Sequence, residues 1–344
     1  MSTQTENSTV NAAEAVAWYL EGRFGLNVVN LLQGALMLGM NFPVFWAVLF
    51  HETLRMDKSY VVMGLLAAMD ALNGFCYVDA SRQRLFDTYR GRQHVPVPTS
   101  ACLMQPFALL WMLADYGAPI MLLVVSVDRF VAVVFPVRYL KMGQTYTLLL
   151  CGPPMGSAVA LAAAGIAVAG HKATLGVMQQ PQCWMSGLVG NTIREIYTYA
   201  RVGFSVASVV VYGLLMIVYV RRHAQRRKVH HETSSANNSR TRESAAVTRQ
   251  LKEQRRLTVS LGISCLFTLL LSVTPIVLVE LFYLSGKSSW LRWGGFDWEM
   301  LAWVTNNVNP LLNVLIYIKR QREIKIGIKA ALQFKSLPLN KQLW

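Results

Sequence analysis

A charged pair follows directly after a long apolar segment in the middle of the chain. Asp128 and Arg129 come after the apolar residues 101–127, and Phe130 and Pro136 follow them. An adjacent acid and base form an ion pair, and charges at the end of an apolar helix are costly unless that end is a functional surface. On its own, the pair only suggests that this helix end is a functional surface.

Three further acids, Asp70, Asp115 and Glu280, lie in otherwise apolar segments. A carboxylate there must find hydrogen-bond partners or a cation. For Asp70 the natural candidates are Asn41, Asn309 and Asn313, and a polar cluster that only locks helix packing is the alternative. Asp115 has no evident partner, which makes it a candidate ligand-binding residue.

Further residues at similar depth are candidates for the lining of a ligand pocket. For each aromatic residue among them, packing or anchoring at the membrane interface is the simpler explanation. These candidates are Trp111, Tyr197, Tyr199, Arg201, Glu280, Trp303 and Asn307.

The elements that must position these residues are membrane helices. Charged residues make up 15% of the 344 residues, well below the roughly 25% of a soluble domain. The mean hydropathy is +0.34. A bilayer core requires about 20 apolar residues per helix. This length predicts seven spans, which form one bundle: 26–50, 59–78, 101–127, 146–169, 202–220, 257–284 and 299–318.

The basic residues orient this bundle, because Lys and Arg near span ends favour the cytoplasmic side. Most of them fall in segments that an extracellular N-terminus would place inside. We therefore expect an extracellular N-terminus over residues 1–25, the bundle over 26–318, and a cytoplasmic amphipathic helix and tail over 319–344. The first outer loop resists this assignment, because it carries Arg82, Arg84, Arg90 and Arg92.

The net charge of +15 therefore lies mostly on the cytoplasmic side. There it would meet the anionic lipid bilayer and an acidic protein partner. No nucleic-acid motif accompanies it. After Tyr317, apolar Ile324, Ile328 and Leu332 alternate with lysines and arginines, which predicts a basic amphipathic helix on the membrane.

Asp128-Arg129-Phe130 at the end of the third span resembles the Asp-Arg-Tyr motif of rhodopsin-like (class A) G-protein-coupled receptors, with phenylalanine in place of tyrosine. Together with residues 135–139, this sequence is most similar to that of nematode serpentine chemoreceptors. The resemblance covers residues 26–334. It implies an all-α membrane protein, a seven-transmembrane helix bundle with a short C-terminal amphipathic helix.

The chain departs from the family in several motifs. Residues 306–317 offer two frames for Asn-Pro-x-x-Tyr: Asn309-Pro310, with Asn313 in place of the tyrosine, or Asn313 to Tyr317, with valine in place of the proline. In the sixth span, Pro275 is kept, but Ser272-Val273-Thr274 replaces Cys-Trp-x. A proline removes a backbone donor, so Pro275 and Pro310 predict helix kinks. Tyr212 matches the inward tyrosine of the fifth span.

The resemblance also implies covalent features and an ion. Cys102 and Cys183 match the family's disulfide across the mouth of the bundle; Cys76, Cys151 and Cys265 are expected to be small core residues. Sodium, which the family binds at the position of Asp70, is implied here, and no other metal or cofactor is expected. Asn7-Ser8-Thr9 is a glycosylation sequon, usable on the extracellular side.

The implied mechanism is a two-state switch. Asp128 holds Arg129 in the inactive state, and movement of the sixth helix frees Arg129 and opens a cytoplasmic cavity. The matching place for a further acid on the sixth helix holds Arg255, with Glu253 two residues before it. We therefore expect a weakened lock with raised basal activity.

These expectations describe a plasma-membrane receptor, not an enzyme. It would bind an extracellular small molecule or peptide and activate a heterotrimeric G protein, with arrestin-type regulators as further partners. An opsin is excluded because residues 299–318 contain no lysine. An ion-coupled transporter using Asp70, Asp115 and Glu280 remains the alternative.

Overall fold

The computed structural model describes residues 3–92, 95–233, 262–285, 298–320 and 322–332. This part of the chain is mostly helical, with one two-stranded sheet. The elements are α1 (Thr3–Phe50), α2 (Glu52–Met56), α3 (Lys58–Tyr89), β1 (Val97–Pro98), α4 (Thr99–Leu103), α5 (Pro106–Val134), α6 (Pro136–Lys141), α7 (Gln144–Thr174), β2 (Met178–Gln179), α8 (Met185–Thr233), the π-helical turn η1 (Leu269–Val273), α10 (Thr274–Leu284), α11 (Trp298–Arg320) and α12 (Arg322–Leu332). Residues 262–268 are also helical and lead into η1.

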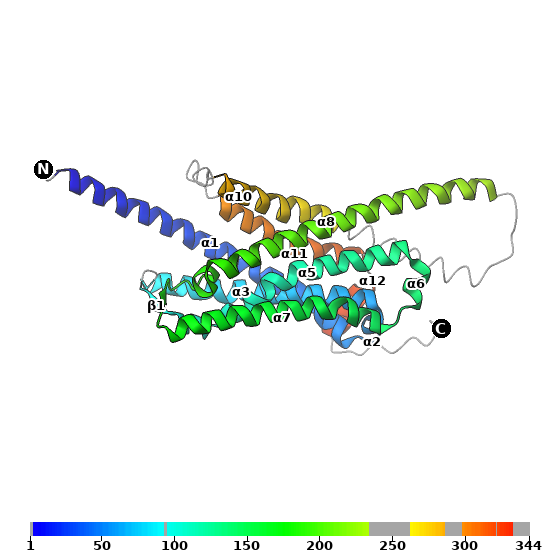
Figure 1. Cartoon of the computed structure of the whole chain (residues 1–344), viewed down its shortest axis with the longest axis horizontal. Helices are drawn as coiled ribbons and strands as arrows, with labels where there is room; N and C mark the ends of the chain where they lie inside the picture. Colours follow the sequence, from blue (N-terminus) through cyan, green and yellow to red (C-terminus); the bar gives the residue numbers. More distant parts are fainter. Residues whose placement is uncertain (1–2, 93–94, 234–261, 286–297, 321, 333–344) are drawn as a thin grey trace.

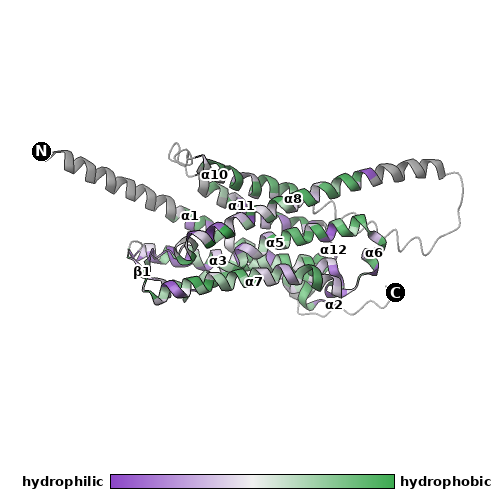
Figure 2. Cartoon of the chain, viewed as in Figure 1, coloured by the Kyte–Doolittle hydropathy of each residue, from purple (hydrophilic) through white to green (hydrophobic). Residues whose placement is uncertain are grey.

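The long helices lie side by side as a bundle. β1 lies at one end, and α2, α6 and α12 lie at the opposite end (Figure 1). Where they are coloured in Figure 2, the long helices carry hydrophobic stretches interrupted by hydrophilic residues. Six helices of the described residues are long and apolar enough to cross a membrane: Phe24–Phe50, Lys58–Tyr89, Pro106–Val134, Gln144–Thr174, Gly187–Arg221 and Gly262–Val279.

The coarse prediction of a multi-pass helical bundle is therefore confirmed. The predicted seventh span, 299–318, corresponds to α11, which is not among the six apolar spans. Its asparagines at 306, 307, 309 and 313 lower its hydropathy, because they are polar side chains in an otherwise apolar segment. That α11 crosses a membrane stays a prediction.

The second helix is much longer than its predicted range, 59–78. α3 continues to Tyr89, so Arg82 and Arg84 are helical and do not belong to an outer loop. Arg84 is only 3% exposed, and Arg82 pairs with Asp79 one turn earlier at 2.8 Å. Arg82 and Arg84 were therefore assigned to the outer loop only because the end of the second helix was predicted too early. Hydropathy falls at Asp79, but the helix does not end there.

The third span begins later than predicted, at Pro106. Cys102 lies on the separate short helix α4, and Met104 and Gln105 interrupt the helix before α5. Pro106 stands in the first turn of α5, where its missing N–H leaves no bond unmade. The first helix differs in the other direction, since α1 begins at Thr3 without a break at residue 25 and includes the sequon Asn7.

Two glycines allow α1 and α3 to approach at backbone distance. A Cβ added at Gly74 would lie 2.6 Å from the Leu38 backbone nitrogen and 2.9 Å from the Gly34 carbonyl oxygen. A Cβ at Gly34 would meet the Gly74 carbonyl oxygen at 2.8 Å. Because these are backbone atoms, no side-chain rotation can relieve the overlap.

We therefore expect Gly74→Val to separate α1 from α3 and to destabilise the protein by about 3 kcal/mol, at the upper end of overpacking effects. The matched control is Gly39→Val, because a Cβ at Gly39 meets nothing within 4 Å. The measurement is thermal unfolding of the two purified variants in detergent. Equal melting temperatures would show that the close approach does not matter.

The C-terminal helix α12 packs on the bundle with one face. Ile324 is 1% exposed and belongs to the same apolar cluster as Leu54 and Tyr317. A Cβ at Gly327 would lie 2.6 Å from Leu54 Cδ1, which shows how closely α12 approaches α2. Part of the apolar face of α12 is therefore covered by protein, and the prediction of an amphipathic helix lying on the membrane stays a prediction.

Candidate functional site

The Asp128–Arg129 pair lies buried at the end of α5 next to α6. The two side chains are 1% and 3% exposed, respectively. Arg129 Nε donates to Asp128 Oδ2 at 2.9 Å, and Arg129 Nη2 contacts the same carboxylate oxygen. Nη2 also donates to Ser59 Oγ of α3 at 2.6 Å. Arg129 is thus held by its neighbour on α5 and by the start of α3.

A tyrosine that follows the motif completes this network. Tyr139 lies on α6, which turns back because Phe135 (φ −124°, ψ 57°) ends α5 and Pro136 starts a new helix. Its hydroxyl accepts from Arg129 Nη2 at 2.9 Å, donates to Asp128 Oδ1 at 3.1 Å and contacts Ser59 Oγ at 2.9 Å. Burial raises the pKa of Tyr139, so its hydroxyl remains a donor to Asp128 at physiological pH.

Lys58 fastens α6 in this position. Its Nζ donates to the carbonyl of Met142 at 2.7 Å and to the carbonyl of Tyr139, and it lies 4.1 Å from the centroid of the Tyr139 ring. The last carbonyls of a helix lack partners within the helix, so a lysine there satisfies them. We assigned no role to Tyr139, Ser59 or Lys58 from the sequence. The available signal was that a basic residue, Lys58, and a hydroxyl-bearing residue, Ser59, stand at the start of the second span, on the same side as the short loop that contains Tyr139.

We expect Tyr139→Phe to raise basal signalling about two- to fivefold, because a net hydrogen bond contributes about 1 kcal/mol to the closed arrangement. Asp128 and Ser59 still hold Arg129 in this variant. The control is Tyr89→Phe, which removes the hydroxyl of a tyrosine that is 89% exposed near the opposite end of the bundle. Nucleotide exchange in membranes with matched receptor amounts checks this, and identical rates for Tyr139→Phe and the parent protein would contradict it.

The other predicted switch residues gather around one apolar cluster. Tyr212 on α8 and Tyr317 on α11 are 3% and 2% exposed, and both belong to the cluster against which Phe130 packs. The sixth-helix residues Glu253 and Arg255 lie outside the described residues. The weakened lock therefore stays a prediction.

A small polar cavity of about 60 Å³ lies in the middle of the bundle. Its described lining comes from α3, α5, α8, η1 with the helical residues before it, and α11. It comprises Leu66, Asp70, Asn73, Ala114, Asp115, Ala118, Pro119, Leu122, Arg201, Ser205, Thr268, Ser272, Asn306, Asn309, Pro310 and Asn313.

Three of the four residues predicted around a sodium ion line this cavity, namely Asp70, Asn309 and Asn313. The fourth does not: Asn41 is fully buried and its amide donates to the Met37 carbonyl at 3.0 Å. Thr268 donates to Asn309 Oδ1 at 3.1 Å, and Ser264 donates to Asn313 Oδ1. Each amide oxygen keeps a second lone pair, so this oxygen-rich set fits a hard cation.

Asp115 also lines the cavity, but it is paired, contrary to expectation. Arg201 Nη1 on α8 lies 3.0 Å from Asp115 Oδ1 on α5, and their side chains are 7% and 22% exposed. The prediction of an unpaired acid was wrong because its partner comes from another helix, where sequence reasoning placed Arg201 at a span edge. The pair joins α5 to α8 beside the cavity.

Of the remaining predicted pocket residues, those with described side chains do not line this cavity. Among the described lining residues, neither Trp111 nor Asn307 appears, whereas the neighbouring Asn306 does. Trp111 packs edge-on against Tyr77, with ring centroids 5.0 Å apart, so packing accounts for it. The side chains of Glu280 and Trp303 lie outside the described residues.

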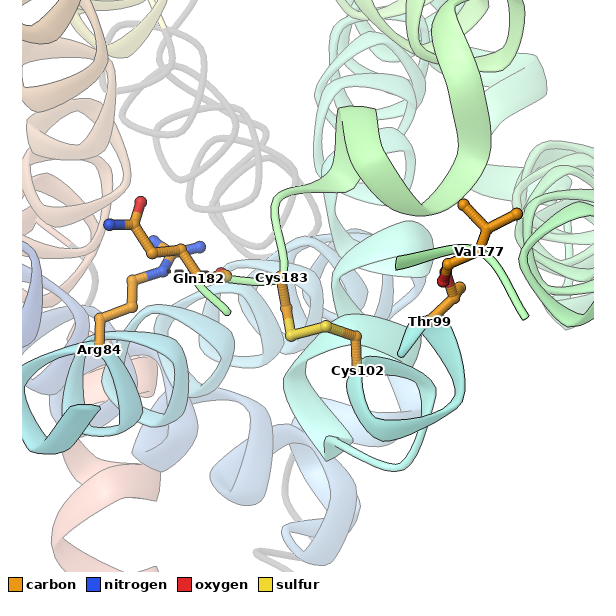
Figure 3. The surroundings of a disulfide bond; sticks show 6 residues. All are labelled: Arg84, Thr99, Cys102, Val177, Gln182 and Cys183. Carbon is orange, nitrogen blue, oxygen red and sulfur yellow. Dashed lines mark hydrogen bonds between the residues drawn. A yellow bond between two sulfur atoms is a disulfide. The ribbon is translucent and has the colours of Figure 1, made fainter. Parts of the chain in front are cut away.

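The disulfide expected between Cys102 and Cys183 is present, with Cα atoms 5.4 Å apart (Figure 3). It joins α4 to the segment between β2 and α8. On one side, the Thr99 hydroxyl donates to the Val177 carbonyl at 2.7 Å; on the other, Arg84 Nε donates to the Gln182 carbonyl at 3.1 Å (Figure 3). Residues 177–183, which include β2, are therefore attached at each of these three places.

Comparison with known proteins agrees with this geometry. The model of the family described as serpentine type 7TM GPCR chemoreceptor Srsx matches residues 89–290, more than half of the chain. No curated protein matches the chain. The matched range includes the Asp128–Arg129 pair and both disulfide cysteines. The chain therefore belongs to the Srsx family of serpentine seven-transmembrane chemoreceptors, which are G-protein-coupled receptors.

Proposed function

We propose that the protein binds an extracellular small molecule or peptide and activates a heterotrimeric G protein through movement of the sixth helix. The observation that carries this proposal is the buried network of Asp128, Arg129, Tyr139 and Ser59. A buried ion pair is weak evidence for stability alone, because desolvation offsets much of its attraction. A switch at the end of the bundle, in which this network forms and breaks, would explain why a buried ion pair is present there.

The sixth helix contains a place where it can bend. The π-helical turn Leu269–Val273 immediately precedes Thr274-Pro275, and the Thr274 hydroxyl donates to the Leu269 carbonyl at 2.7 Å. π-turns and prolines are the usual causes of helix kinks, since both interrupt the regular backbone ladder. Ser272 and Thr268 of the same stretch line the central cavity. A ligand in the cavity would thus contact the part of the helix that bends.

The finer assignments belong to the same proposal. The N-terminus faces outside, α11 is the seventh span, and α12 lies at the cytoplasmic face of the plasma membrane with its basic residues toward anionic lipid. Arrestin-type regulators would bind the same face as the G protein. Sodium at Asp70 would stabilise the inactive state by balancing a buried carboxylate.

The experiment is nucleotide exchange on a panel of G proteins by the full chain in nanodiscs. Exchange above that of empty nanodiscs on at least one G protein is expected, because a weakened lock gives basal activity. The alternative of an ion-coupled transporter rests on Asp70 and Asp115 lining one cavity. Ion flux in proteoliposomes without any nucleotide exchange would favour that alternative over the receptor.

A further inference from the structure

The central cavity is lined by charged groups of both signs, and the basic group says more about the ligand than the acidic groups do. Its described lining contains two carboxylates, Asp70 and Asp115, and one guanidinium, that of Arg201. A bundle that served only to hold a cation would not need a buried arginine in the same wall. The cost of burying charge in an apolar surrounding makes each such group a functional candidate.

The Asp115–Arg201 pair is poorly explained as a packing device. It joins two helices that already pack through aromatic rings directly beside it: Tyr116 on α5 meets Phe204 on α8 at a ring-centroid distance of 5.4 Å. Replacing buried ion pairs by apolar side chains is often neutral or stabilising. The apolar contact was therefore available at this place, and the pair has another purpose.

The geometry points to a small zwitterion, a molecule with one ammonium and one carboxylate group, as the ligand that this cavity recognises; the inference rests on the proposed receptor function. Such a ligand parts the ion pair. Its ammonium binds Asp115 and its carboxylate binds Arg201, so the ion pair that is lost is replaced by two new ones.

A ligand with a single charge would do worse at the same place. An amine bound to Asp115 takes the carboxylate away from Arg201, and a carboxylic acid bound to Arg201 takes the guanidinium away from Asp115. In each case the attraction between Asp115 and Arg201 is lost and is replaced at only one of the two groups, and this penalty reduces affinity. The cavity therefore discriminates by requiring both charges in one molecule.

The volume of the cavity is consistent with a small zwitterion. With the pair closed, the free volume is about 60 Å³, enough for a few waters or a fragment of few heavy atoms. Because Arg201 and Asp115 belong to different helices, a ligand placed between them moves α8 relative to α5. Ser205, one turn after Arg201, and Ser272 in η1 line the same space, so this displacement reaches the bend of the sixth helix.

The test uses 4-aminobutanoate and shorter and longer unbranched amino acids as zwitterionic probes. Butylamine and butyrate, each of which carries only one of the two charged groups of 4-aminobutanoate, serve as its halves. Thermal unfolding of the purified full chain in nanodiscs, without G protein, reports binding separately from signalling. We expect at least one zwitterion to raise the melting temperature by about 2 °C or more, a shift readily resolved for a chain of this size, whereas neither half does so.

Two variants invert the selectivity. Arg201→Gln leaves Asp115 without its cation, so butylamine alone now stabilises the protein. Asp115→Asn removes the carboxylate beside Arg201, so butyrate alone does. Arg82→Gln, which removes an exposed arginine that pairs with Asp79, is the matched control and should keep the parent selectivity.

Stabilisation of the parent protein by butylamine or butyrate as strongly as by any zwitterion overturns the inference, and so does the absence of a shift with every probe. If either variant fails to fold, the zwitterion-against-half comparison in the parent protein decides alone. A zwitterion that binds without stimulating any G protein would support the ligand class while refuting the receptor function.

Discussion

We expect Asp128→Asn to raise basal nucleotide exchange. Asp128 is 1% exposed and provides the carboxylate that faces Arg129, and an amide of the same size cannot balance the guanidinium charge. Removing one partner of a buried ion pair costs roughly 3–5 kcal/mol. Each 1.4 kcal/mol lost by the closed state relative to the open state raises the open population about tenfold, so we expect exchange to rise about tenfold or more.

The measurement compares this variant with the parent protein on the G protein that responds best, at matched surface expression. Asp79→Asn is the control, because it neutralises a carboxylate that pairs with Arg82 outside the network. Exchange by Asp128→Asn at or below the parent rate would show that Asp128 does not restrain Arg129.

The second large effect concerns the disulfide. Cys102 and Cys183 are 81 residues apart, and a cross-link over such a loop stabilises the folded state by about 4 kcal/mol in the chain-entropy model. We expect Cys102→Ser to lower the melting temperature by about 8 °C and to reduce surface expression, since about 2 °C is lost per kcal/mol in a protein of this size.

The double variant Cys102→Ser, Cys183→Ser should behave like the single variant, because both lack the same bond. Cys151→Ser, at a buried free cysteine, controls for the loss of sulfur itself. A double variant as stable as the parent protein would show that the bond contributes nothing to the fold.

Local patterns predicted the parts of the molecule that lie within one segment. The positions of the helices follow from apolar runs, and Asp128 and Arg129 are adjacent in sequence, so their pairing needs no knowledge of the fold. The disulfide came from a motif resemblance and not from spacing. Boundaries were less accurate: α3 extends to Tyr89 because polar residues at a helix end satisfy their charges locally, as Arg82 does with Asp79.

Apart from the disulfide and the grouping of Asp70 with Asn309 and Asn313, contacts between distant segments were not predicted. Ser59 meets Arg129 across 70 positions and Arg201 meets Asp115 across 86, and a single sequence does not encode which faces of two helices meet. For this reason Ser59 received no role and Asp115 was expected to be unpaired. Tyr139 is only 10 positions from Arg129, and it reaches Arg129 because the chain turns at Phe135 and Pro136 from α5 into α6. The π-helical turn Leu269–Val273 was also missed, because its hydropathy is that of an ordinary helix.

The central claim is that freeing Arg129 activates the protein, and one comparison tests it most directly. Basal nucleotide exchange is measured for Asp128→Asn and for the double variant Asp128→Asn, Arg129→Ala at equal surface expression. The account predicts that the increase caused by Asp128→Asn disappears in the double variant, because the released guanidinium is what engages the G protein. If the double variant keeps the increased exchange, Arg129 is not the group that the network restrains, and the account is wrong.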